Sequence, residues 1–137
     1  MDKSVLAIDP GHAKCGMAVV RRDEQGELHL DWMAVVPPEE LAAKIHEAFA
    51  AKPFSMAIVG SGTHSRPIIA TIREELPSMG TLVVDEKDTS LQARERYWEF
   101  NPRRGWRRLL PASLQVPPEP VDAYVAFILA ERVLLER

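Results

Sequence analysis

The sequence predicts an α/β fold, a five-stranded mixed sheet with helices on both faces. The first 36 residues hold three short apolar or alternating segments separated by turn residues, a pattern typical of an antiparallel meander. After residue 38, segments with helical spacing alternate with short apolar runs, which is typical of parallel strands joined by helices. The predicted order is βββαβαβα, then a basic loop and a C-terminal helix. A length of 137 residues fits one domain, 1–137.

The meander begins with Ser4–Asp9, a short apolar run that stops at the turn residues Pro10-Gly11. Lys14–Arg21 is the second predicted strand, and residues 23–26 (Asp-Glu-Gln-Gly) form a hairpin connection. Leu28–Val36 alternates between apolar and polar residues, which suits a half-buried strand near a sheet edge. We expect one face of this strand to carry Leu30, Trp32 and Ala34, and the other His29, Asp31 and Met33.

The second half of the chain is predicted from the change to helical spacing. Apolar residues at this spacing, among them Leu41, Ile45, Ala48 and Phe49, predict a helix over 38–51. The remaining predicted elements are a buried strand at 54–60, a helix at 65–76, a strand at 81–85, a helix at 89–100, an irregular segment rich in proline and arginine at 101–120, and an apolar helix at 121–136.

Composition sets limits on the class of protein. The hydrophobic fraction of 46% and charged fraction of 27% are ordinary for a globular protein. Cys15 is the single cysteine, so an internal disulfide and a cysteine-rich zinc site are excluded, and we expect it to be packed in the second strand. The apolar run at the N-terminus is too short for a signal peptide or membrane span, so we expect a cytoplasmic protein. The net charge of −3 argues against a protein that coats nucleic acid but allows an enzyme with a local basic strip.

Three carboxylates from distant segments are candidate functional residues. Asp9 ends a strand at the carboxyl edge, where open α/β sheets bind ligands, although it would also serve to cap the Pro10-Gly11 turn. Asp85 and Glu86 end the fifth strand at the same edge, and only one of them should face a site there; the alternative is helix capping. Asp122 heads the apolar face of the last helix, a position that the helix dipole also favours without a function.

Carboxylates gathered at one edge would repel one another unless cations neutralised them. Donor sets made only of oxygen favour Mg²⁺ or Mn²⁺ over zinc. Two such ions would activate a water and stabilise the leaving oxygen of a phosphodiester. The residues therefore suggest a two-ion site for phosphodiester hydrolysis.

A basic segment supplies candidate phosphate contacts. Residues 103–108 read RRGWRR, and their four arginines could clamp phosphates while the indole of Trp106 stacks on a base; the alternative is a solvated loop with Trp106 in the core. A second candidate is the loop after the fourth strand, where Gly62, Thr63 and His64 could offer backbone amides to a phosphate, although the spacing is not that of a P-loop. His12 and His64 are weak candidates, and His29 and His46 are expected at the surface. The candidate contacts from the basic segment are Arg103, Arg104, Trp106, Arg107 and Arg108.

At three places the sequence resembles the RuvC and YqgF/RuvX branch of the ribonuclease H-like proteins. IDPGHAKCGMAVV is similar to the opening of that branch, VDEKDTSLQARER to the YqgF segment that reads approximately DERLTT, and VDAYVAFILAERVL to its last helix. The three matches follow the family's order. The resemblance implies a ribonuclease H-like fold and a metal-dependent nuclease, either a Holliday-junction resolvase or a nuclease that processes the 5′ end of precursor 16S ribosomal RNA. It also selects Asp9, Glu86 and Asp122 as catalytic and metal-binding residues, and it suggests Lys14 as a nucleic-acid contact.

Two other functions are compatible with these residues. A non-catalytic nucleic-acid-binding module could keep the fold without turnover. The segment from Asp9 to Gly16 also resembles the first phosphate loop of the actin and sugar-kinase superfamily, but that family closes two domains around ATP. A junction resolvase cuts two symmetric strands, so that function would also predict a homodimer.

Overall fold

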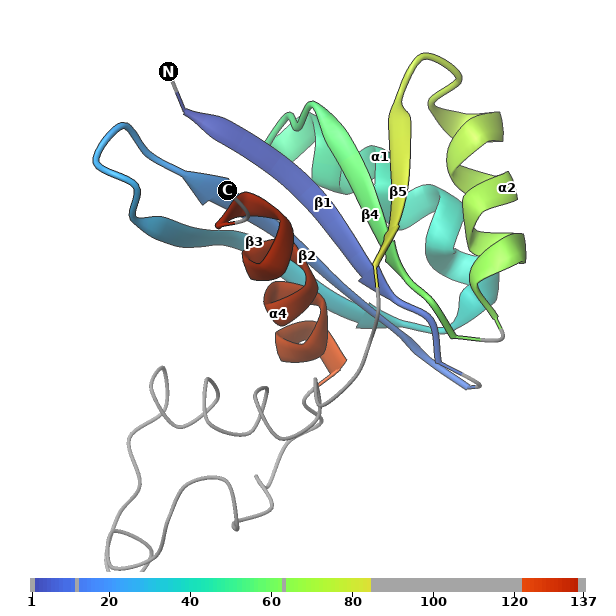
Figure 1. The fold of residues 1–137 in the computed structure, drawn as a ribbon. Coiled ribbons are helices and arrows are strands. Elements are labelled where there is room, and N and C mark those ends of the chain that lie inside the picture. The colour runs from blue at the N-terminus through green and yellow to red at the C-terminus, as the bar shows by residue number, and fades with distance from the viewer. Residues whose placement is uncertain (1, 12, 63, 85–121, 136–137) are drawn as a thin grey trace, which may run out of the picture.

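The computed structural model describes residues 2–11, 13–62, 64–84 and 122–135. Its sheet has five strands in the order β3-β2-β1-β4-β5, shown in Figure 1. β1–β2 and β2–β3 are antiparallel, whereas β1–β4 and β4–β5 are parallel. The predicted meander followed by a parallel half is therefore confirmed. The strands are β1 (Lys3–Asp9), β2 (Cys15–Arg22), β3 (Leu28–Val36), β4 (Met56–Gly60) and β5 (Gly80–Val84).

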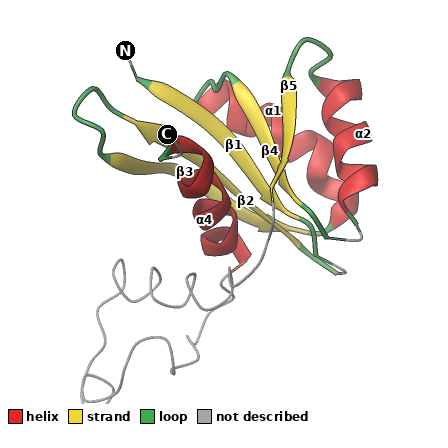
Figure 2. Cartoon of the chain, in the orientation of Figure 1, coloured by secondary structure: helices red, strands yellow, loops and turns green. Residues whose placement is uncertain are grey.

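Helices cover both faces of this sheet, as predicted (Figure 2). A short 3-10 turn, η1 (Pro38–Glu40), leads into α1 (Leu41–Ala51), and α1 and α2 (Ser65–Glu75) lie together on one face. α4 (Asp122–Leu134) packs on the other face against β1 and β2. None of the described helices is long and apolar enough to cross a membrane. The predicted helix at 89–100 and the segment at 101–120 lie outside the described residues.

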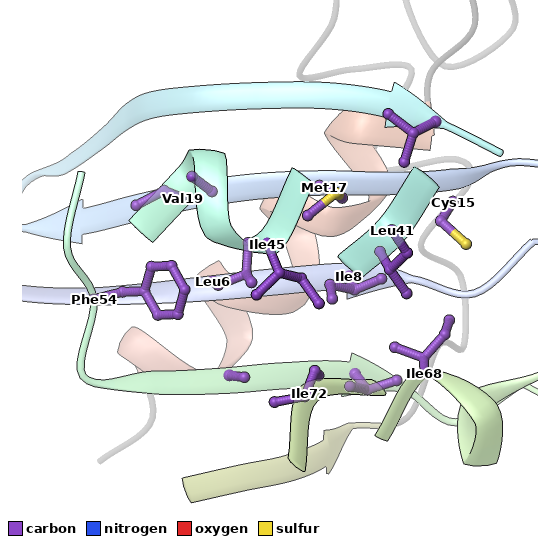
Figure 3. Close-up of a cluster of buried hydrophobic side chains, with 14 residues drawn as sticks. Leu6, Ile8, Cys15, Met17, Val19, Leu41, Ile45, Phe54, Ile68 and Ile72 are labelled. Carbon is purple, nitrogen blue, oxygen red and sulfur yellow. The ribbon is translucent and has the colours of Figure 1, made fainter. Parts of the chain in front are cut away.

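The core has two layers, and alternation along β1 divides its residues between them. Val5 and Ala7 belong to the cluster under α4. Leu6 and Ile8 belong to the cluster under α1 and α2, drawn in Figure 3. Cys15 is 1% exposed in this second cluster, which confirms that it is a packed residue of the second strand.

The prediction for the faces of β3 is wrong. Leu30 packs against the α4 cluster, whereas Trp32 and Ala34 pack against the α1 and α2 cluster. The cause is an irregularity in the β2–β3 register: Val19 pairs with Trp32 but the next residue, Val20, pairs with Leu30. Asp31 is the extra residue of a β-bulge, which reverses the alternation from that point. Its carboxylate accepts a 2.9 Å hydrogen bond from Arg21 Nε.

Candidate active site

Asp9 is the last residue of β1 and lies at the carboxyl end of the parallel strands. It is half-buried. Because residues two apart in a strand share a face, Asp9 lies on the same side of the sheet as Val5 and Ala7, which is the side that α4 covers. The strand pattern therefore directs this carboxylate toward the α4 face.

Glycines flank Asp9 on both neighbouring strands. Gly16 is its direct partner on β2. On the other side, Ile8 pairs with Val59, so the next residue of β4, Gly60, lies beside Asp9. Neither neighbour has a Cβ, so a ligand can approach the carboxylate from either side more closely than it could past larger residues. Gly60 was not predicted as part of the site, and its signal in the sequence is a glycine at the end of an otherwise apolar strand.

The turn after Asp9 depends on a further glycine. A Cβ at Gly11 would overlap with the backbone carbonyl oxygen of Lys14 and would lie 3.1 Å from its carbon. The overlap is with backbone, which cannot move aside as the end of a flexible side chain can. The backbone at position 11 therefore approaches that of Lys14 this closely only with glycine, and this contact helps to set the path from β1 into β2.

The direction of α4 places its first residue at the same edge. Arg22 Nη1 donates a 2.8 Å hydrogen bond to the carbonyl oxygen of Leu134, near the end of the helix. Arg22 is itself paired with Lys3 at the start of β1, so α4 runs back along β1 in the opposite direction (Figure 1). The 13 residues of α4 and the seven residues of β1 each span roughly 20 Å, so the helix is about as long as the strand. The backbone of Asp122, which begins α4, therefore lies toward the Asp9 end of the sheet.

β5 also ends at this edge. Val84 is its last residue, pairs with Gly60, and packs against the α4 side of the core. The amide of Ser61 donates a 2.9 Å hydrogen bond to the Val84 carbonyl, which ties the start of the next loop to the end of β5. Asp85 and Glu86 follow in the sequence and lie outside the described residues. The structure thus brings Asp9 and the start of α4 to one edge, and the chain leaves β5 toward Glu86 from that same edge.

Two of the predicted phosphate-contacting segments lie partly within the described residues. Lys14 is exposed in the β1–β2 connection, at the edge of Asp9. His64 is exposed at the start of α2, and with Gly11, Cys15 and Pro38 it lines a pocket of about 140 Å³. Gly62 accepts a 3.1 Å hydrogen bond from the Ser65 amide. His12, Thr63 and the predicted arginine cluster (Arg103, Arg104, Arg107 and Arg108, with Trp106) lie outside the described residues.

A separate group of potential metal ligands occurs at the β2–β3 hairpin, where Asp23, Glu27 and His29 have donor atoms within 4.8 Å of one another. Asp23 Oδ1 accepts hydrogen bonds from the amides of Gln25 and Glu27, and Asp23 Oδ2 lies 2.7 Å from His29 Nε2. The hydrogen bond with His29, more than those with the amides, lowers the pKa of Asp23. These contacts close a hairpin in which Gly26 has a φ of 86°. The group therefore has a structural role.

Comparisons with known proteins agree with this fold. No protein-family model matches the sequence, and no curated protein does. Among solved structures, T. thermophilus RuvC in complex with a Holliday junction substrate is similar, with a TM-score of 0.59 and 16% identity over 95% of this chain and 90% of that chain. The fold is ribonuclease H-like. A second Thermus thermophilus RuvC structure has a TM-score of 0.58, with 14% identity over 95% of this chain and 91% of that chain.

A mitochondrial protein extends the comparison. The yeast mitochondrial Holliday junction resolvase Ydc2 has a TM-score of 0.56 and 9% identity, over 96% of this chain and 78% of that chain. The ribonuclease H-like fold expected from the sequence motifs is confirmed by these structures. They do not single out the YqgF/RuvX branch.

Proposed function

We propose that this protein is a metal-dependent nuclease that hydrolyses phosphodiester bonds of structured nucleic acid. The observation that carries the proposal is the arrangement around Asp9: a carboxylate at the carboxyl end of the central strand, with a glycine on each neighbouring strand and the start of α4 at the same edge. Such an edge is where open α/β sheets bind ligands. The RuvC and Ydc2 structures support nucleic acid as the ligand.

The donor set fits a hard divalent cation. In this proposal Asp9, Glu86 and Asp122 hold two Mg²⁺ or Mn²⁺ ions, for which carboxylate oxygens are the preferred ligands. The neighbours of Asp9 on both adjacent strands are glycines, so no side chain of theirs competes with an ion for the space beside its carboxylate. When bound, such ions lower the pKa of a water and neutralise charge on the leaving oxygen.

The residues of the chain itself would bind and position the substrate. Lys14 is exposed just before the start of β2, at the same edge of the sheet as Asp9. Its ammonium would contact a phosphate as a point charge. The arginines of the RRGWRR segment would contact flanking phosphates, and Gly62, Thr63 and His64 form a further candidate phosphate loop. Within this class of substrate, the two specific candidates are precursor 16S ribosomal RNA, cut at its 5′ end, and a four-way DNA junction.

The test is cleavage of a labelled structured RNA and of a four-way DNA junction, each with Mn²⁺ or with chelator. Asp9→Asn should abolish cleavage because it removes one carboxylate charge while keeping the side-chain shape. Asp2→Asn is the matched control, since Asp2 lies just before the start of the same strand and contacts Arg21 at 3.0 Å. It should cut at the wild-type rate.

Each outcome assigns the function differently. Manganese-dependent cutting that Asp9→Asn loses and Asp2→Asn keeps would support the nuclease, and the preferred substrate would distinguish RNA processing from junction resolution. Equal cutting by wild type and Asp9→Asn would refute the site. Tight binding without cutting under any metal condition would replace the nuclease with a non-catalytic binding module.

A further inference from the structure

A second recess lies at the edge of the sheet opposite Asp9. Its volume is about 310 Å³, and its lining includes Ser55 and Met79, which precede β4 and β5. These are the amino ends of β4 and β5, whereas Asp9 is at the carboxyl end of β1, so the length of the parallel strands separates the recess from Asp9. The last turns of α1 and α2 contribute Phe49 and Glu75 to its wall.

The electrostatic character of this recess favours a cation. α1 and α2 both end here, and the last carbonyls of a helix carry the negative end of its dipole. Glu75 adds a carboxylate, and its Oε2 lies 2.5 Å from Nε2 of His46 on α1, which holds the group between the two helices. Among the residues described around the recess, none that lines it is an arginine or a lysine.

An aromatic ring is exposed in the same wall. Helical spacing predicts that Phe49 belongs to the buried face of α1, yet it is 37% exposed. Phe54 holds it by an edge-to-face contact, with ring centroids 5.2 Å apart and an interplanar angle of 89°. An exposed aromatic ring attracts cationic groups through its negative face, more strongly when the cation is desolvated, and Phe49 lines the same recess as the Glu75 carboxylate.

We propose that this recess binds an arginine side chain of a partner protein. A guanidinium is planar and stacks on an aromatic ring, while its five donors match a carboxylate and carbonyl oxygens. Its three-carbon stem would lie along Leu76 and Pro77, which also line the recess. A lysine ammonium is more strongly hydrated and does not stack, so it fits less well. A partner bound here leaves the Asp9 edge open to nucleic acid.

The binding test uses the whole ¹⁵N-labelled chain and N-acetyl-arginine-N-methylamide as the probe, at millimolar concentration. The expected result is a saturable shift of the amide signals of Phe49, Glu75 and Met79. The citrulline analogue has nearly the same shape without the charge and should leave them unmoved. Equal shifts with citrulline, no shift with arginine, or tighter binding of the lysine analogue would each overturn the proposal.

Two variants locate the binding. Glu75→Gln should weaken arginine binding about tenfold, because it removes a charge-assisted contact worth about 1.4 kcal/mol. Phe49→Leu keeps the apolar volume but removes the ring face, and should also weaken it several-fold. Glu47→Gln is the control, since this exposed acid on α1 contacts Lys44 at 2.8 Å, and it should bind arginine as wild type does.

The controls separate folding and self-association from ligand binding. Thermal unfolding of each variant shows whether it is folded. If Phe49→Leu is not folded, the arginine affinity of Glu75→Gln alone tests the proposal. Equal affinities for Glu75→Gln and Glu47→Gln would place the binding elsewhere. A dimer that sedimentation detects and that Glu75→Gln disrupts would identify a second copy as the occupant and refute a partner protein.

Discussion

Gly11→Ala is expected to disturb the Asp9 edge while leaving the rest of the sheet intact. The added Cβ would overlap with the Lys14 carbonyl oxygen, and contacts below 3.0 Å are essentially absent for real Cβ atoms. Relief requires movement of backbone in the β1–β2 turn. Asp9 and Gly16 form the last pair of the β1–β2 ladder, so they are the first residues that such a movement displaces.

The size of this effect follows from two opposing terms. Forcing a methyl group into a closed space costs about 1–3 kcal/mol. Replacing glycine by alanine also restricts the unfolded chain, which raises the unfolding free energy by about 0.4–1 kcal/mol. The net loss of unfolding free energy is therefore about 0–2.6 kcal/mol, with a midpoint of about 1.3 kcal/mol. If Asp9 acts in catalysis, a displacement of about 1 Å would in addition slow cleavage roughly a hundredfold.

Gly80→Ala is the matched control, since a Cβ there meets nothing within 4 Å and Gly80 is exposed at the start of β5. Urea denaturation of both variants measures the free energy of unfolding, and the cleavage assay measures the second effect. We expect Gly80→Ala to gain about 0.4–1 kcal/mol of unfolding free energy, because the same restriction of the unfolded chain applies there without a steric cost. Equal stabilities for the two variants would refute the reasoning about the turn, whatever the outcome for cleavage.

Three further perturbations test other parts of the structure. Replacing Arg22 by Met removes the 2.8 Å hydrogen bond to the Leu134 carbonyl and should lower the unfolding free energy by about 1 kcal/mol. Urea denaturation measures this loss. An unchanged denaturation midpoint would show that this hydrogen bond does not hold the end of α4. The hydrogen bond with His29 lowers the pKa of Asp23 in the folded protein below its ordinary value of 3.8. The stability that Asp23 contributes is therefore complete above pH 3.8, and it is lost as the pH falls through the lower pKa of the folded state. Asp23→Ala should therefore show a smaller loss of unfolding free energy on acidification below about pH 4 than wild type, and parallel curves would contradict this. Arg104→Ala should weaken nucleic-acid binding and reduce the slope of log affinity against log salt by about 0.9, whereas an unchanged slope would remove its role as a phosphate contact.

Local signals were sufficient for most of the fold. The predicted bounds of the third strand, Leu28–Val36, are those of β3, and α2 ends one residue earlier than the helix predicted at 65–76. Such elements are set by hydrophobic spacing and by neighbouring turn residues, both of which the sequence displays directly. The mixed topology followed from the order of the elements and the preference for short connections.

Features that depend on a partner element were not predictable in the same way. The bulge at Asp31 arises from the register of β3 against β2, and nothing within the β3 sequence signals it. The exposure of Phe49 depends on where α1 ends relative to α2 and on the position of Phe54. In both cases the element itself was predicted correctly, but residues on other elements decided which of its positions are covered.

The same distinction applies to the candidate site. The position of Asp9 at a strand end was predicted from the residues alone, and the structure adds the face toward which it lies. The role proposed for Gly60 required knowing that β4 is the neighbour of β1, which follows from the crossover connection through α1. Glu86 and the arginine cluster remain predictions, because they lie outside the described residues.

The small residues beneath α4 connect the core to the candidate site. Ala7 and Ala18 are direct partners in the β1–β2 ladder, and both lie in the cluster that α4 covers. α4 in turn contributes Ala126 and Ala130, which are fully buried, so helix and sheet can approach closely at this contact. Close approach brings the start of α4 down toward the plane of the sheet at the edge where Asp9 lies. The packing that buries this half of the core therefore also sets how near the backbone at the start of α4 lies to the Asp9 edge.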